Sequence, residues 1–364
     1  QVQAELAATI GREFSLDLLR RVLAADPPAL KDALHRLQAE GLVERIDASD
    51  GLFRHALIQE ATYQSQTRAE RQEAHRRIAA VLDQHYAERV ASQPELLARH
   101  QAGGGDIRQA IASWARAGQR AMHASAHQEA MAHFQAALDL VSTLPAAPDR
   151  DQTECALLLG LGPALHATEG YGSEGATRVA QRISALRHGL ADHTARFQAE
   201  WARLRTMLAA HGPRGVPQAA AGLLQLAGED PVSQQAAHYV AAVATFWLGE
   251  FEASRSQAAR ALALYVPQHH AVLLERFGED LSVSYAGHLS WALCFLGQPE
   301  EAQAVRARMF QQARAMQHPK TLAMALLFAT MLSRWLNQHA QTLSLSTECL
   351  ALTRQHGMAH WADT

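Results

Sequence analysis

Arg54 and His55 are the residues of this sequence best placed to do chemistry. They stand in the stretch "FRHALIQEATY", residues 53–63, directly before what the pattern predicts to be a short helix. Backbone N–H groups at a helix N-terminus attract anions, and an imidazole there is well placed to contact a bound anion. The alternatives are a nucleic-acid contact or a histidine that only caps or packs a hairpin, and these residues alone leave all three open.

Catalytic and metal-binding motifs are missing from the sequence. A phosphate-binding loop needs a lysine after a glycine, but Lys31 and Lys320, the only lysines, follow leucine and proline. The run "GYGSEG" at 170–175 matches the dinucleotide pattern GxGxxG, yet no strand precedes it, so we interpret it as a turn between helices. His123 and His127 stand four residues apart without an HExxH motif or an acidic partner. We therefore expect no enzyme activity, no metal site and no cofactor within this segment.

The composition favours a helical protein of the cytoplasm. Hydrophobic residues make up 48% of the chain and aromatic residues 6%, and alanine and leucine are abundant. The formal net charge of −3 gives no reason to expect nucleic acid or an anionic membrane as the main partner. Cys155, Cys294 and Cys349 are too far apart for a disulfide framework, and no apolar run approaches the length of a membrane span. Because the chain starts at Gln1 rather than Met, we expect a piece of a longer protein.

Residues 1–65 predict a small winged-helix domain. Two helices, "AELAATIG" and "EFSLDLLRRVL", come first, and Ser15 is a suitable N-cap for the second. The third helix, "PPALKDALHRLQAEG", has proline at its start and glycine at its end. The short runs "LVERI" and "LFRH" then flank the turn "DASDG" and predict a β-hairpin. Four apolar residues near the end of this domain are predicted to lie in its core: Phe53, Leu57, Ile58 and Tyr63.

A winged helix raises the question of DNA binding, and charge argues against it. The third helix offers Lys31 and Arg36 as donors but carries Asp32 and Glu40 beside them. Residues 1–75 hold 9 Arg plus Lys against 12 Asp plus Glu, which leaves a net charge of −3. DNA is therefore an unexpected partner.

From residue 66 to the end the pattern is helical. We predict connecting helices over 66–105 and an α-solenoid of degenerate tetratricopeptide-like helical hairpins over 106–364. Residues 111–144 match the tetratricopeptide template, whose bulky, small and aromatic positions fall on five residues: Trp114, Gly118, Ala130, Phe134 and Ala137. Small residues at 118 and 130 would let two antiparallel helices approach closely.

Later repeats are recognised by their turns. "LGEFEA" contains Gly249, and "LGQPEEA" contains Gly297 and Ala302. Further pairs near 152–190, 193–226 and 320–355 are predicted from helical pattern alone. Stacked pairs create a concave groove, and four tryptophans are candidates for lining it, with core packing as the alternative: Trp114, Trp201, Trp247 and Trp291.

Several separated motifs occur in an order that resembles one bacterial family. They are "IGREFSLDLLRRVL", "LHRLQAEGLV", "FRHALIQEATYQS", "QPELLARHQAGG", "AIASWARAGQRA" and "EAMAHFQAALDLVSTLP". Together they resemble the winged-helix and tetratricopeptide-like region of AAA/STAND-type regulatory ATPases, which are often fused to class III adenylate/guanylate cyclase domains. The resemblance runs through nearly the whole chain and is strongest over 8–145.

This resemblance implies an ATPase module, with its ATP or ADP and Mg, upstream of the present chain. In such ATPases a histidine where the hairpin meets the next helix can reach the phosphates of bound ADP. His55 matches that position, with Arg54 beside it, although "FRH" is not the usual form of the motif.

The function we expect is that of a non-catalytic regulatory or sensor segment. Its repeat arm would bind a protein, peptide or small effector and couple that binding to the upstream nucleotide module. One alternative is a winged-helix transcriptional regulator with a tetratricopeptide-like sensing arm. Another is a scaffold with no link to an ATPase.

Overall fold

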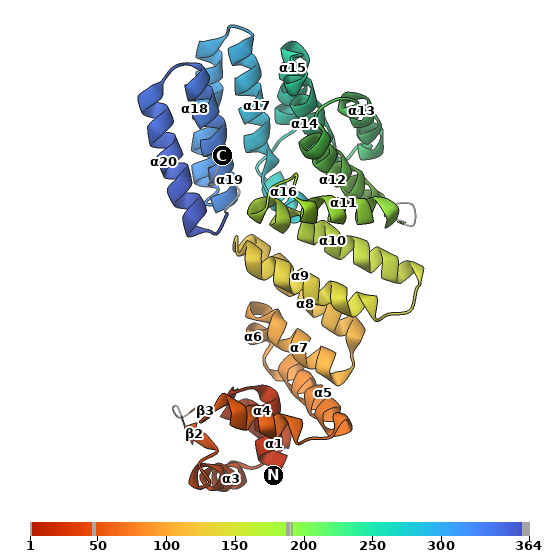
Figure 1. Cartoon of the computed structure of the whole chain (residues 1–364), viewed down its shortest axis with the longest axis vertical. Coiled ribbons are helices and arrows are strands. Elements are labelled where there is room, and N and C mark those ends of the chain that lie inside the picture. The colour runs from red at the N-terminus through yellow and green to blue at the C-terminus, as the bar shows by residue number, and fades with distance from the viewer. Residues whose placement is uncertain (1, 46–48, 187–189, 191, 359–364) are drawn as a thin grey trace. The chain divides into compact units, whose positions relative to one another are not determined.

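The computed structural model describes residues 2–45, 49–186, 190 and 192–358. Helices dominate the described chain, and its few strands all lie near the N-terminus (Figure 1). The elements in chain order are α1 (Val2–Ile10), β1 (Glu13–Ser15), α2 (Leu16–Leu23), α3 (Pro27–Ala39), β2 (Val43–Arg45), β3 (Asp50–Phe53), α4 (Ala56–Gln64), α5 (Arg68–His85), α6 (Ala87–Ser92), α7 (Pro94–Gly104), α8 (Ile107–His123), α9 (His127–Ser142), α10 (Pro148–Thr168), α11 (Glu174–Leu186), α12 (His193–His211), α13 (Val216–Ala227), α14 (Pro231–Trp247), α15 (Phe251–Ala263), α16 (His269–Phe277), α17 (Leu281–Phe295), α18 (Pro299–Ala315), α19 (Pro319–Trp335) and α20 (His339–Gln355).

The chain divides into two compact units, each described here by itself. Unit 1 is Gln1–Ala117 and unit 2 is Gly118–Thr364, so the division falls within helix α8. The finer division at residues 65 and 105 stays a prediction. Among the described residues, no helix is both long enough and apolar enough to cross a membrane.

Unit 1 begins with three helices and a small antiparallel sheet. Ser15 caps α2 by accepting a hydrogen bond from the Leu18 N–H at 3.3 Å, as predicted, and Asp26 caps α3 in the same way. The strand order is β1–β3–β2, with Phe14 opposite Gly51 and Val43 opposite Phe53. The predicted helices and hairpin are present, whereas strand β1 was missed because three residues are too few to show an alternating pattern.

The predicted Asp-Gly turn is wrong in position. Asp50 and Gly51 lie within β3, and residues 47 and 48 of the predicted turn lie outside the described residues. A Cβ added at Gly51 would lie 2.6 Å from Phe14 Cζ, a separation that real Cβ atoms do not show. Glycine is therefore needed at this position to admit the aromatic ring of the neighbouring strand, and not to reverse the chain.

The predicted core of this region needs one correction. Phe53 is fully buried, and Ile58 and Tyr63 pack against the core of unit 1, but Leu57 is 82% exposed. Helix α4 faces α1 through Gln59, whose side-chain amide donates to the Ala8 carbonyl at 2.8 Å. Since Leu57 precedes Gln59 by two positions, it lies on the opposite face of this helix.

Four helical pairs, α8/α9, α14/α15, α17/α18 and α19/α20, share one kind of turn. A residue with positive φ ends the first helix of each pair: Ser125, Gly249, Gly297 and Asn337. The next N–H in each turn donates to the carbonyl five residues earlier, always at 2.9 Å: Ala126 to Ala121, Glu250 to Thr245, Gln298 to Leu293 and Gln338 to Ser333. Glycine and asparagine adopt this left-handed conformation most readily. Asn337 thus marks the turn between α19 and α20 that helical pattern alone could not locate.

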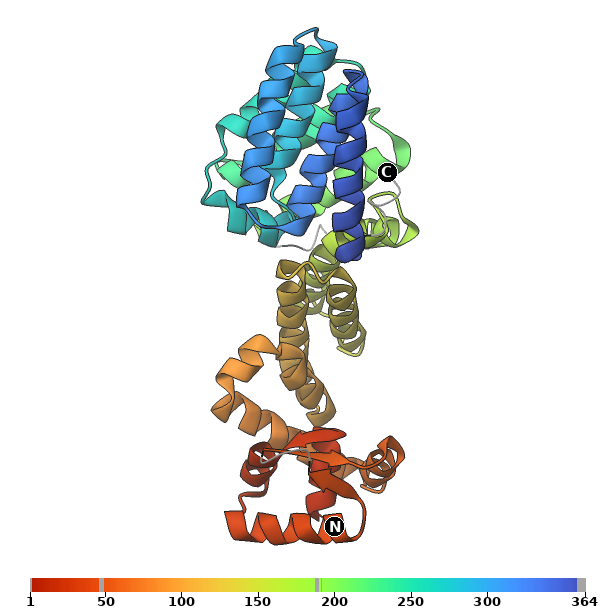
Figure 2. The same cartoon turned by 90° about the vertical axis from the view of Figure 1, so that its left-hand side faces the viewer.

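Small residues allow the helices of unit 2 to pack closely. The Phe134 ring of α9 lies against Gly118 of α8 and Gly160 of α10, where added Cβ atoms would approach it to 2.8 and 2.6 Å. Ala130, Ala137 and, in the later repeat, Ala302 are completely buried. Helices α17 to α20, coloured blue, lie side by side in Figures 1 and 2 and enclose an apolar core rich in aromatic rings.

Candidate functional site

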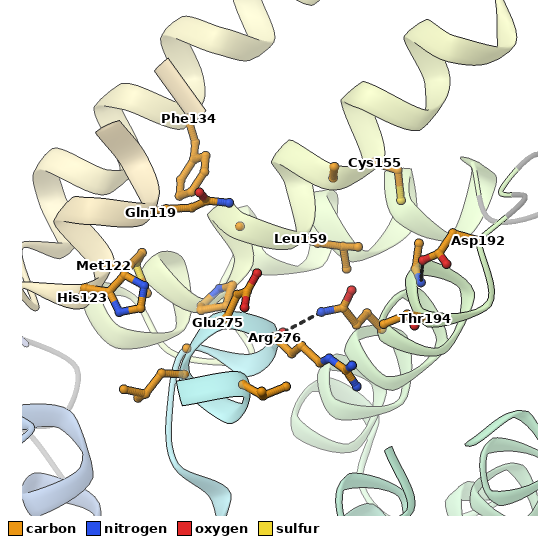
Figure 3. Close-up of a pocket in the computed structure, with 18 of the residues that line it drawn as sticks. Gln119, Met122, His123, Phe134, Cys155, Leu159, Asp192, Thr194, Glu275 and Arg276 are labelled. Carbon is orange, nitrogen blue, oxygen red and sulfur yellow. Dashed lines mark hydrogen bonds between the residues drawn. The ribbon is translucent and has the colours of Figure 1, made fainter. Parts of the chain in front are cut away.

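A cavity of unit 2, here called the polar cavity, has a volume of about 670 Å³. Helices α8, α9 and α10 line one part of it, and the start of α12 and the short helix α16 line the rest. Figure 3 shows Gln119 and His123 of α8 on one side, Thr194 of α12 on the other, and Glu275 of α16 between them. This volume is within the usual range for cavities that bind small ligands.

Some residues around the polar cavity are held in place by hydrogen bonds. The Asp192 carboxylate caps α12 by accepting from the Ala195 N–H at 2.7 Å, and the Gln198 amide donates to the Arg276 carbonyl at 3.2 Å (Figure 3). The Arg276 guanidinium pairs with Asp230 at 2.6 Å. These contacts hold the N-terminal end of α12 and helix α16 in place beside the cavity.

Other side chains lining the polar cavity are exposed and polar. They comprise two amides, an imidazole and a carboxylate: Gln119, Gln152, His123 and Glu275. Met122, Leu159 and Pro163 add apolar surface. Such a lining suits the recognition of a ligand that carries hydrogen-bonding groups.

The polar cavity contains no activated nucleophile among these residues. Cys155 is its only thiol, and burial raises the pKa of this thiol to about 11, so it is protonated at neutral pH. In the described part of the chain, no three His, Cys, Asp or Glu side chains are grouped so that they could hold a metal ion.

A second cavity of about 520 Å³ lies in unit 2 and is here called the aromatic cavity. Its walls come from α12, α14, α17, α19 and the loop before α11. The rings that line it are Tyr171, Tyr239, Trp247, His288, Trp291 and Phe328. A single cationic side chain, Arg205 of α12, shares this wall. An apolar lining with one charged group is typical of a specific ligand site.

Buried charges stand behind the aromatic cavity. Glu279 is 2% exposed and accepts a hydrogen bond from the Tyr171 hydroxyl at 2.6 Å, while its Oε2 atom has no partner. Lys320 is 1% exposed, and its Nζ lies 4.0 Å from Glu279 Oε1 and 3.4 Å from the Gly278 carbonyl oxygen. Burial lowers the pKa of Lys320, and the Glu279 carboxylate opposes that shift.

Arg205 is held between two tyrosine rings. Its guanidinium carbon lies 4.5 Å from the centre of the Tyr171 ring and 4.9 Å from that of Tyr239. The His166 ring stacks on the Tyr171 ring, and the two ring centres lie 4.2 Å apart. Arg205 is 8% exposed and its Nε atom has no hydrogen-bond partner.

The residues predicted to contact an anion lie in unit 1. His55 occupies the N-cap position of α4, is exposed, and makes no side-chain cap hydrogen bond. Arg54 forms an exposed ion pair with Glu44 at 2.8 Å. The exposed imidazole is therefore neither a core residue nor a cap, and its role toward nucleotide remains a prediction.

The four candidate tryptophans have different surroundings. Trp247 and Trp291 line the aromatic cavity, and Trp247 is 57% exposed. Trp201 is a core residue whose ring centre lies 4.7 Å from that of Phe277. Trp114, at the predicted bulky position of the repeat template, is partly buried on the unit 1 portion of α8.

The buried group at the aromatic cavity was missed by sequence reasoning. Its members are far apart in the chain: Tyr171, Arg205, Glu279 and Lys320. Tyr171 belongs to "GYGSEG", which is an inter-helix turn as predicted, but one that also places a ring in the interior. The rarity of lysine could have marked Lys320, since only two lysines occur in the chain.

Comparison with known proteins identifies a fold rather than a family. No protein-family model matches the chain. An uncharacterized protein of Rhizobium meliloti (strain 1021), R02095, is 27% identical over 330 residues, which cover 89% of this chain and 32% of that protein. The chain therefore spans about a third of the length of this curated relative.

Solved structures with similar folds were also found. A Rap protein complexed with Competence and Sporulation Factor matches with a TM-score of 0.56 and 13% identity, covering 95% of this chain and 86% of that one. A STAND protein with a tetratricopeptide repeat sensor from Pyrococcus horikoshii matches at a TM-score of 0.40 and 14% identity, covering 98% and 60%. The second score is too low to support a conclusion. With the helical pairs described above, the first match shows that the chain has a mainly α, tetratricopeptide-like helical-repeat fold.

Proposed function

We propose that this chain is a non-catalytic regulatory segment whose unit 2 binds an effector in the polar cavity. The observation that carries the proposal is a cavity of about 670 Å³, bounded by helices α8, α9, α10, α12 and α16 and lined by exposed amide, imidazole and carboxylate groups. The effector would be a protein, a peptide or a small molecule. The Rap protein of similar fold, solved in complex with Competence and Sporulation Factor, supports binding as the use of such a fold.

Effector binding would change the activity of another module in a longer protein. The Rhizobium relative is about three times as long as the matched region, which leaves room for an output module. The resemblance in sequence suggests that this module is an ATPase, with or without a cyclase domain. An effector could shift such a module between two states only if it binds one of them more tightly.

The cavity itself provides the test of effector binding. Ala156 lines the polar cavity and is exposed, so Ala156→Trp fills the cavity without removing a buried contact. A synthetic library of five- to eight-residue peptides should yield ligands that the chain binds saturably by calorimetry, and Ala156→Trp should weaken them at least about tenfold.

Ala132→Trp is the matched control, because Ala132 is exposed on α9 and lies outside the lining of this cavity. It should bind these peptides like the unaltered chain. If the Ala156→Trp variant binds the peptides as tightly as the unaltered chain, the polar cavity is not the effector site.

His55 is proposed to sense nucleotide in the longer protein. Its exposed ring at the N-terminus of α4 is placed to contact an anion such as a phosphate of ADP. In the full-length protein, His55→Ala should speed ADP release, measured by stopped-flow with a fluorescent ADP analogue. His85→Ala, which alters another exposed histidine, should leave the rate unchanged. Identical release rates in both variants would show that His55 does not touch nucleotide.

A further inference from the structure

Basic side chains outnumber carboxylates in the group of buried residues around the aromatic cavity. Arg205 and Lys320 are both buried, and Glu279 is the carboxylate that lies among them. Asp280, the next residue, is engaged separately, because it accepts from Tyr265, from His270 and from the Ser282 N–H that it caps. The group therefore holds two basic side chains and one carboxylate, and its arginine is always charged.

Of the two basic side chains, Arg205 lines the aromatic cavity. Lys320 has the Gly278 carbonyl and the Glu279 carboxylate nearby, whereas no carboxylate of the described residues lies within 4 Å of Arg205. The Nε–H of Arg205 is buried and has no acceptor. An unpaired buried donor and an uncompensated buried charge are both unfavourable, and an anion in the cavity that Arg205 lines would compensate the charge.

The other walls of the aromatic cavity define what the anion is attached to. Trp247, Trp291, Phe328 and Met324 contribute rings and a thioether, so the remainder of the ligand must be apolar. Trp247 is 57% exposed and gives the cavity a wall that reaches solvent. The cavity of about 520 Å³ has the size of a site for a small molecule or for one end of a peptide.

We propose that the aromatic cavity binds a monocarboxylate attached to an aromatic or branched apolar group, with Arg205 as the carboxylate partner. A guanidinium binds a carboxylate through charge-assisted N–H donors, and Arg205 is the cationic side chain that lines this cavity. The single negative charge of a monocarboxylate suits the one guanidinium in the lining, whereas a phosphate dianion would place a second charge in an apolar cavity. This site is distinct from the polar cavity, and it extends the proposed role of unit 2 as a binding unit.

The carboxylate could belong to a small free acid or to the end of a peptide chain. Two pairs of probes distinguish these sources while testing the shared chemistry. The first pair is 3-phenylpropionate and its uncharged amide, and the second is the tripeptide Gly-Gly-Phe with a free or an amidated C-terminus. Binding is measured by calorimetry and by the fluorescence of Trp247 and Trp291, which line the cavity.

At least one free carboxylate should bind saturably and at least about tenfold more tightly than its amide, since the amide cannot form a charge-assisted pair with Arg205. Binding by 3-phenylpropionate alone identifies a small acid, and binding by the tripeptide alone identifies a peptide end. Amides that bind as tightly as the acids, or no binding by either acid, would overturn the proposal.

Arg205→Gln should abolish the preference for the acid. Arg203→Gln is the matched control, because Arg203 lies on the same helix but pairs with Glu200 at 2.6 Å. Should Arg205→Gln fail to fold, Trp247→Ala replaces it, since the exposed Trp247 side chain can be removed with little effect on the core. Trp247→Ala should weaken binding of the acids at least about tenfold. Unchanged acid binding in a folded Arg205→Gln or Trp247→Ala variant contradicts the proposal.

These outcomes are separable from those of the polar cavity. Ala156→Trp should leave binding of the acids unchanged, because Ala156 does not line the aromatic cavity. Loss of peptide binding in Ala156→Trp, together with failure of the carboxylates to bind, would leave the proposed function standing and refute only the carboxylate site.

Discussion

Replacing Glu279 by glutamine is expected to lower the free energy of unfolding at neutral pH by about 3 kcal/mol. The Glu279 side chain is 2% exposed and lies 4.0 Å from the buried Lys320 ammonium group. Glutamine keeps the size and can still accept from the Tyr171 hydroxyl, but it removes the negative charge. Removing one partner of a buried ion pair leaves the other charge uncompensated in a medium of low dielectric constant.

Two comparisons make this effect specific. Glu275→Gln, an exposed change on the preceding helix α16, should alter stability by no more than about 0.5 kcal/mol. Adding Lys320→Met to Glu279→Gln should recover most of the lost stability, because replacing both buried charges avoids the unpaired one. Urea unfolding followed by circular dichroism measures all three variants. An unchanged midpoint for Glu279→Gln would show that the carboxylate does not stabilise this interior.

Acid is expected to destabilise the chain steeply below pH 6.5. Burial holds the pKa of His100, His127 and His288 at about 3, and that of His318 at about 4, compared with 6.5 for an exposed histidine. Between those pKa values the unfolded chain binds a proton on each histidine and the folded chain does not. Stability therefore falls as the pH falls, and each such histidine contributes about 1.4 kcal/mol per pH unit.

The histidines differ in how they are kept neutral. In unit 1, His75 and His100 place their Nδ1 atoms 2.9 Å apart, so only one of these two nitrogens can carry a hydrogen. In unit 2, His288 donates from Nδ1 to the Ser284 carbonyl and is surrounded by the rings of Tyr239, Trp291 and Phe328. These three rings hydrogen-bond to the Tyr63 hydroxyl, to one another and to the Ser284 carbonyl, and none of these partners carries a negative charge that would stabilise an imidazolium ion.

His288→Phe tests this account directly. Phenylalanine suits the aromatic surroundings and removes one titrating group, so the loss of stability between pH 6.5 and 5 should shrink by about 2 kcal/mol. His211→Gln, an exposed change on α12, should leave the slope unaltered. Urea midpoints measured at pH 7, 6 and 5 give the slopes. A His288→Phe variant as acid-sensitive as the unaltered chain would contradict the assignment.

Local signals allowed much of the fold to be predicted. Ser15 predicted a helix start, because an N-cap depends on one hydrogen bond that spans three residues. Gly249 and Gly297 predicted turns, because the left-handed backbone conformation depends mainly on the type of a single residue. Gly118 and Phe134 followed a template whose spacing reflects the contact between neighbouring helices. These features depend on residues close together in the chain.

Features that depend on a partner could not be predicted. Leu57 is apolar and stands in a helix, yet its exposure was decided by which face of α4 meets α1. Gly51 has the residue type of a turn, but the Phe14 ring on the neighbouring strand is what requires a glycine there. His55 was placed correctly before a helix, but its exposure depends on the packing of the whole hairpin region.

By itself the sequence determined the fold class: a mainly α, tetratricopeptide-like helical-repeat chain with a β-hairpin near its N-terminus. Tertiary structure alone decided where its charges meet. Tyr171 reaches Glu279 across 108 positions, and Lys320 reaches Gly278 across 42. The physical reason is that a helix specifies which of its residues share a face over three or four positions, while the burial of a charge depends on helices that the chain brings together much later.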